Sequence, residues 1–261
     1  MRGCKLIRNW YLALLTLGAI LTLTVPVYSA APPGYPDSVY AGDPREMALL
    51  PRYCIYTIVF RDVVPGGGNQ EEIKRWSSVM GATFNAMHHY CAGLIETNRA
   101  IFLSRTPQDR EFYLNDSIIE YDYVIQRAPP EFILLPEILT KKGENLIRLG
   151  RGHLAVPELQ RAIDLKPDYW PPYVQLSDYY KGTGDFEKAR AYLEKALSYT
   201  PEVKILKTRL TELEAVHAKR KTAPQSIEQS TKPRPATSGR PAQQSQPAKA
   251  RPTESPAPAA Q

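Results

Sequence analysis

One pattern recurs along the chain at a spacing of 34 residues, and it constrains the fold more than any other feature. Residues 170–201 read WPPYVQLSDYYKGTGDFEKARAYLEKALSYTP, and residues 136–167 read PEILTKKGENLIRLGRGHLAVPELQRAIDLKP. Aligning the copies pairs Gly150 with Gly184, Ala155 with Ala189, Leu159 with Leu193, Ala162 with Ala196, Ile163 with Leu197, and Pro167 with Pro201. A period of helix, turn, helix and closing proline predicts an array of stacked helix pairs.

The two copies resemble the tetratricopeptide repeat family. The motif residues are Tyr173, Leu176, Ser177, Tyr180, Gly184, Asp185, Phe186, Ala189, Leu193, Ala196 and Pro201 in the second copy, and Leu139, Gly143, Leu146, Gly150, Ala155, Leu159, Ala162 and Pro167 in the first. The resemblance implies an all-α fold, an antiparallel helix-pair array of the α-solenoid type. Pro157 departs from it, because a proline inside a helix removes a hydrogen bond unless the helix starts late, near Leu154.

Each repeat needs neighbours to bury its faces, so the flanking segments should be helical too. We assign residues 44–105 to extra N-terminal helices, 106–135 to the second helix and loop of a degenerate repeat, 136–169 and 170–203 to the two repeats, and 204–218 to a capping helix. Helix starts are legible at Asp43-Pro44-Arg45-Glu46, at Asn69 with Glu72, and at Thr106-Pro107. The first two have the form of an N-cap with a capping-box glutamate.

The two ends of the chain differ in composition from the middle. Residues 1–30 join a basic start, an apolar run and a small-residue ending, which predicts a secretory signal peptide, with an uncleaved membrane anchor as the alternative. Residues 31–43 follow as a linker. Residues 219–261 are rich in proline, alanine and glutamine and lack aromatic residues, which predicts a disordered tail.

Charge is distributed unevenly. The chain has a net charge of +6, while the tail alone carries +6 and the first thirty residues +3, which leaves −3 for the body between them. A basic nucleic-acid groove in the folded part is therefore not expected. The tail is either a solvated spacer or a segment that associates with anionic membranes or acidic wall polymers.

Cys54 and Cys91 are the two cysteines that follow the leader, and in an oxidising compartment an even count suggests a disulfide. It would tie a helix over 44–62 to a helix over 70–104; the alternative is two separate buried thiols. The string MHHYC at 87–91 also raises a metal or redox hypothesis that uses His88, Cys91 and Cys54. Against it, Met80, Phe84, Met87 and Cys91 fall at the spacing of a buried helix face.

Catalytic motifs are missing from the sequence: it contains no nucleophile elbow, HExxH or phosphate loop. We therefore expect a non-enzymatic protein without a cofactor or bound metal. The resemblance implies that the first helices of successive repeats line a concave groove for a peptide or protein segment. Transferred to this chain, the groove positions are Glu137, Thr140, Glu144, Ile147, Arg148, Pro171, Val174, Asp178 and Lys181.

The family's carboxylate clamp places Lys and Asn where this chain has Thr140 and Glu144, so a clamp is not expected, and Glu137 and Glu144 favour a neutral or basic ligand. The sequence as a whole predicts an exported scaffold or assembly factor of the bacterial envelope, periplasmic or secreted, with inner-membrane anchoring as the alternative. Its partner would be a protein or peptide and not a nucleic acid. The other functional readings are a metal or redox protein and a wall-associated adaptor that acts through the tail.

Overall fold

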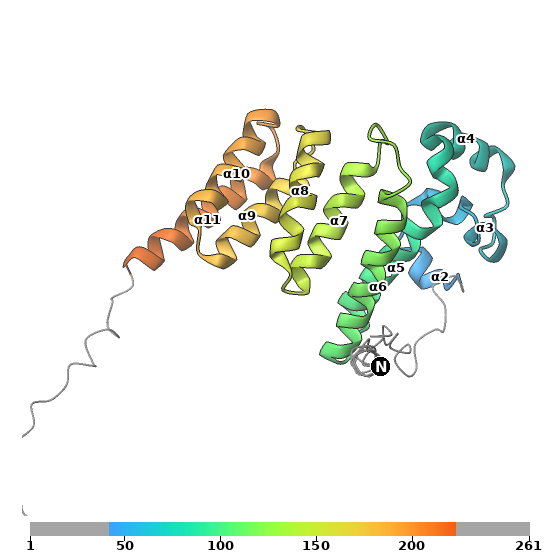
Figure 1. Ribbon diagram of the computed structural model, residues 1–261, viewed down its shortest axis with the longest axis horizontal. Coiled ribbons are helices and arrows are strands. Elements are labelled where there is room, and N and C mark those ends of the chain that lie inside the picture. Colours follow the sequence, from blue (N-terminus) through green and yellow to red (C-terminus); the bar gives the residue numbers. More distant parts are fainter. Residues whose placement is uncertain (1–41, 223–261) are drawn as a thin grey trace, which may run out of the picture. The chain divides into compact units, whose positions relative to one another are not determined.

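A computed structural model describes residues 42–222 (Figure 1). Over these residues the chain forms α-helices and short 3-10 helices, and no strand occurs within that range. The predicted leader, most of the linker and the tail beyond residue 222 lie outside the described residues. No helix in the described part combines the length and hydrophobicity needed to span a membrane.

Seven consecutive helices make the array in Figure 1, and each packs on the next as far as α10. They are α5 (Met87–Phe102), α6 (Pro107–Ile125), α7 (Leu135–Arg148), α8 (Gly152–Leu165), α9 (Pro171–Thr183), α10 (Phe186–Tyr199) and α11 (Lys204–Thr222). The pairs α7–α8 and α9–α10 correspond to the two sequence repeats. The prediction of an all-α array of helix pairs is confirmed.

Small residues bring these helices together as the pattern predicts. The motif alanines Ala155, Ala162, Ala189 and Ala196 are all buried. A methyl group added at Gly143 would lie 2.6 Å from Cγ of Leu159, so α7 approaches α8 as closely as only glycine permits. The turn after α9 depends on Gly184, whose φ of 87° is accessible to glycine at low cost.

The region before the array differs from the prediction. The expected helix over 44–62 is broken into α2 (Pro44–Met47), a 3-10 turn at Arg52–Tyr56 and α3 (Phe60–Val63). Pro51 explains the first break, because the residue before a proline is pushed out of the helical conformation. The expected helix over 70–104 is also divided, into α4 (Gln70–Met80), a 3-10 segment at Gly81–Ala86 and α5.

Glu46 does not close a capping box. Asp43 does cap α2 by accepting a hydrogen bond from the Arg45 backbone N–H. The Glu46 carboxylate instead binds the buried Arg99 guanidinium of α5, with Nε–Oε1 and Nη2–Oε2 distances of 2.6 and 2.8 Å. Arg99 also donates to Glu96 at 3.0 Å. This buried ion cluster fastens α2 to the array, which the sequence pattern did not reveal.

The predicted disulfide between Cys54 and Cys91 is present. Both residues are fully buried, and the bond joins the 3-10 turn before α3 to the first turns of α5. Met80, Phe84 and Met87 lie in the same core, as their spacing predicts. Because the two sulfur atoms bind each other, neither is available as a metal ligand.

The structure also defines two helix ends that the sequence left less certain. Helix α8 begins at Gly152, so Pro157 lies inside it rather than near a late start, and the exposed proline ring is accommodated at the cost of one hydrogen bond. Helix α11 continues through Thr222, four residues beyond the predicted end of the capping helix at 218. Alanine, lysine and arginine at 218–221 are good helix formers, which accounts for the extension.

Candidate partner-binding face

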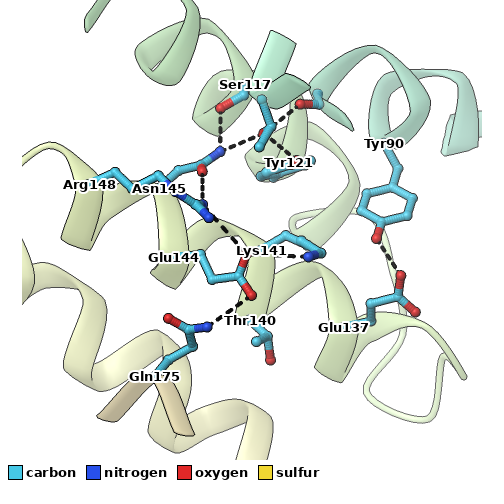
Figure 2. A network of polar contacts seen from close by, with 12 residues as sticks. Tyr90, Ser117, Tyr121, Glu137, Thr140, Lys141, Glu144, Asn145, Arg148 and Gln175 are labelled. Carbon is cyan, nitrogen blue, oxygen red and sulfur yellow. Dashed lines mark hydrogen bonds and ion pairs between the residues drawn. The ribbon is translucent and has the colours of Figure 1, made fainter. Parts of the chain in front are cut away.

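The predicted groove positions lie on the first helices of two successive pairs, α7 and α9. We call the side of the array formed by these helices and α5 the first-helix face. Polar contacts connect its three helices (Figure 2). The Tyr90 hydroxyl of α5 donates to Glu137 Oε1 of α7 at 2.6 Å, and Gln175 Nε2 of α9 donates to Glu144 Oε1 of α7 at 3.2 Å.

Glu144 is the centre of this face. Besides Gln175, its carboxylate accepts a hydrogen bond from Lys141 Nζ at 3.3 Å and lies 3.5 Å from Arg148 Nη1. Only 11% of its side chain is exposed. The negative charge expected at this position therefore already has cationic neighbours within the protein, so a basic ligand would have to compete with them.

The buried side-chain amide of Asn145, the residue after Glu144, connects α5, α6 and α7. Asn145 Nδ2 donates to Thr97 Oγ1 of α5 and to Ser117 Oγ of α6, both at 2.7 Å, and its Oδ1 accepts from Arg148 Nη1 at 2.8 Å. Thr97 is also bonded to the Tyr121 hydroxyl at 2.8 Å. These bonds hold the register of α5, α6 and α7 and orient Arg148, as Figure 2 shows.

The predicted groove residues differ in how exposed their side chains are. Thr140 is buried and donates to the Pro136 carbonyl of its own helix, and Val174 is buried in the core that follows α7. Neither side chain is therefore exposed on the first-helix face. Arg148 is exposed, while Glu137, Glu144, Ile147, Pro171, Asp178 and Lys181 are partly exposed.

Farther along this face, Asp178 pairs with Lys181 of its own helix, with an Oδ1–Nζ distance of 2.8 Å. Arg209 Nη1 of α11 lies 3.8 Å from the same carboxylate oxygen. Lys142 of α7 pairs with Asp122 and Glu158 of other helices, so three carboxylates (Glu137, Glu144 and Asp178) stand against three cations (Lys141, Arg148 and Lys181), and the face has no strong net charge. Its specificity must depend on the arrangement of the charges rather than on their sum.

Tyr169, in the loop before α9, is a further member of this face. Burial raises the pKa of its hydroxyl, and the charges of the Glu137 and Glu144 carboxylates raise it further. The pKa of Tyr90 is raised in the same way, mainly by burial and then by Glu137. The sequence offered a weak signal for Tyr169, a tyrosine directly before the Trp170-Pro171 start of the second repeat.

The MHHYC string does not form a metal centre in this structure. His89 Nδ1 lies 2.6 Å from Glu120 Oε2, and the ring stacks on Tyr123. His88 Nδ1 instead lies 3.0 Å from the Asn85 carbonyl oxygen. Within residues 42–222, no group of three or more His, Cys, Asp or Glu side chains is arranged to hold a metal ion.

The arrangement defines an array of helix pairs, and comparison with a family model agrees for one of them. Residues 171–203 match the family model of the tetratricopeptide repeat, so this part of the chain is a tetratricopeptide repeat. Such repeats generally mediate protein–protein contacts and are generally non-catalytic.

The chain is also similar to the human protein O-mannosyl-transferase TMTC1, with 26% identity over 122 residues. The aligned part covers 47% of this chain but only 14% of the human protein. The transferase activity in that name belongs to the human protein, and so short a match does not assign it to this chain.

Proposed function

We propose that this protein is a non-enzymatic scaffold or assembly factor that binds a protein or peptide segment on its first-helix face. The observation that supports this most directly is the row of polar side chains from Glu137 to Lys181, which runs across the first helices α7 and α9. The row is partly exposed, charge-balanced and positioned by buried bonds. These properties suit the recognition of an extended segment, and they supply no nucleophile with an adjacent base.

We further propose that the protein acts in the bacterial envelope. The Cys54–Cys91 disulfide supports an oxidising compartment, because such bonds are rare in the cytosol. The leader pattern of residues 1–30 points in the same direction. Association with the cell wall or the membrane through the basic tail remains an additional proposal that concerns residues outside the described part.

Site-specific photo-crosslinking in cells tests the binding face. A photo-reactive residue at Lys181 probes the first-helix face, and one at the exposed Glu194 of α10 is the matched control on a second helix. We expect a discrete crosslinked partner from position 181 only. An equal yield from both positions, or a partner from position 194 alone, would refute the assignment.

The variant Glu144→Lys supplies the energetic test. It removes the acceptor that holds Lys141, Arg148 and Gln175 and places a third cation beside the first two, so the arrangement of polar groups on the face is lost and partner capture should be lost with it. Glu194→Lys makes the same change on the other side of the helix pair and should bind as the wild type does. Circular dichroism must show that both variants are folded, and retained capture by folded Glu144→Lys would overturn the proposal.

A further inference from the structure

We propose that a cavity between the α5–α6 turn and the end of α7 binds an acidic segment of a partner protein, in which Asp or Glu side chains stand next to an apolar residue. We call this cavity the arginine pocket. Its volume is about 490 Å³, within the range of sites that hold a few side chains. It is lined by Ser104, Arg105, Thr106, Pro107, Arg110, Glu111, Leu114, Arg148 and Leu149.

Cations dominate the lining of the pocket. It contains Arg105, Arg110 and Arg148 against the single carboxylate of Glu111. Glu111 is already 3.6 Å from Arg151 Nη2, outside the lining. The pocket therefore presents a surplus of positive charge, although the folded body as a whole is acidic by sequence.

Arg105 and Arg110 are the two arginines of the pocket whose guanidinium groups can still pair with carboxylates. Both are exposed, and among residues 42–222 no ion pair involves either of them. The nearby Asp109 carboxylate is engaged elsewhere, since its Oδ2 accepts the backbone N–H groups of Arg105 and Thr106 at 3.3 and 3.2 Å. Guanidinium groups bind carboxylates with two parallel hydrogen bonds, so two adjacent arginines suit an acidic segment.

Apolar walls favour a peptide over a small inorganic anion. Pro107, which is exposed, and Leu149, which is partly exposed, contribute aliphatic surface to the same lining as the arginines. A small anion would use the charges and leave this surface in water, whereas an acidic segment with an apolar side chain would cover both. Phe102, two residues before the pocket begins, is 68% exposed and offers a further apolar contact at the end of α5.

Arg148 connects the pocket to the first-helix face, because the Asn145 amide and the Glu144 carboxylate hold its guanidinium. A partner lying along that face would meet the pocket at the end of α7. In this respect the inference rests on the proposed function and adds to it the acidic character of the partner.

Fluorescence anisotropy with the full-length chain tests the pocket. The probe is a labelled synthetic peptide in which Asp and Glu alternate with Leu and Phe, and the comparison probe carries Asn and Gln instead. The pocket variant is Arg105→Glu with Arg110→Glu. A charge-matched control, Arg161→Glu with Lys195→Glu, changes exposed residues of α8 and α10. A tail variant replaces Lys232, Arg234 and Arg240 with Gln.

We expect the pocket variant to bind the acidic probe more weakly by on the order of tenfold, since two exposed ion pairs are replaced by repulsion. The charge-matched control should change affinity by less than about twofold. Backbone amide resonances of Thr106 and Leu149 should shift on addition of the probe. Equal affinity in the pocket variant, or loss of binding in the tail variant alone, would overturn the inference.

The two proposals fail in different ways. If the Lys181 crosslink persists while the pocket variant binds the acidic probe normally, the pocket assignment is wrong and the first-helix face stands. If the probe binds at the pocket but position 181 gives no partner, the proposed function is wrong.

Discussion

Replacing Asn145 with alanine should destabilise the protein strongly. Its side chain is fully buried and makes three hydrogen bonds, to Thr97, Ser117 and Arg148. The hydroxyls of Thr97 and Ser117 keep other partners, the Gly93 and Leu114 carbonyls, so the substitution removes bonds without leaving either hydroxyl unsatisfied.

The expected magnitude follows from these contacts. The two buried bonds, to Thr97 and Ser117, contribute roughly 1 kcal/mol net each, and the bond from the charged Arg148 to this fully buried amide contributes about as much, which gives about 3 kcal/mol for the three bonds. The better helix propensity of alanine returns about 0.5 kcal/mol, and the small cavity costs a similar amount. The variant should therefore lose about 3 kcal/mol. For a folded part of this size, that loss lowers Tm by roughly 6 to 12 °C.

Thermal and urea unfolding followed by circular dichroism measure this loss, and Asn115→Ala is the matched control. Asn115 also bonds two partners, the Glu111 carbonyl and Arg151 Nη1, but it is partly exposed on α6 and water can replace both bonds. We expect the control to lie within about 0.5 kcal/mol of the wild type. If Asn145→Ala behaves like the control, the buried amide does not hold the three helices together.

Three other perturbations test separate parts of the fold. Reducing the Cys54–Cys91 bond, which closes a loop of sequence separation 37, should lower the free energy of unfolding by about 4 kcal/mol; two free thiols in the non-reduced protein would contradict it. Asp185→Ala removes the N-cap of α10, an acceptor 3.1 Å from the Lys188 N–H, and should shift the urea midpoint by an amount equivalent to about 1 kcal/mol; an unchanged midpoint would show that the cap is dispensable. Burial raises the pKa of Glu96 from 4.5 to about 8, so between these values the folded state retains a proton that the unfolded chain has released, and stability should fall from about pH 5 to about pH 8 relative to Glu96→Gln. Parallel pH profiles for the two proteins would show that Glu96 is not the cause.

The repeat array was predictable because periodicity encodes it. Gly143 and Ala155 are small because another helix leaves no room, and such constraints recur at the same place in each copy. The disulfide could also be inferred, since only two cysteines lie beyond the first thirty residues. The region before α5 lacks a repeating pattern. There the structure has short helices and turns around Pro51 instead of the expected helix over 44–62.

The burial of individual residues on the first-helix face could not be predicted, for a physical reason. A repeat position indicates which helix carries a residue, but not how deeply neighbouring helices cover it, so the burial of Thr140 could not be inferred. The role of Asn145 could not be inferred either, because its hydrogen bonds depend on residues of other helices. The arginine pocket likewise combines Arg105 and Arg148, which are far apart in sequence and belong to different helix pairs.

The disulfide and the buried polar bonds are concentrated in the N-terminal half of the described part, so the two ends of the array should resist force differently. The disulfide, the Glu46–Arg99–Glu96 cluster and the Asn145 bonds all lie between α2 and α7, whereas from α9 to α11 the buried residues are mainly apolar and α11 buries only Leu206 and Leu213. Elements with few buried contacts open first, and repeat arrays unfold from their weaker end. Force applied at the C-terminus should therefore unfold the helix pairs one after another, beginning with α11. The same force applied at the N-terminus would first act on the segment closed by the Cys54–Cys91 disulfide.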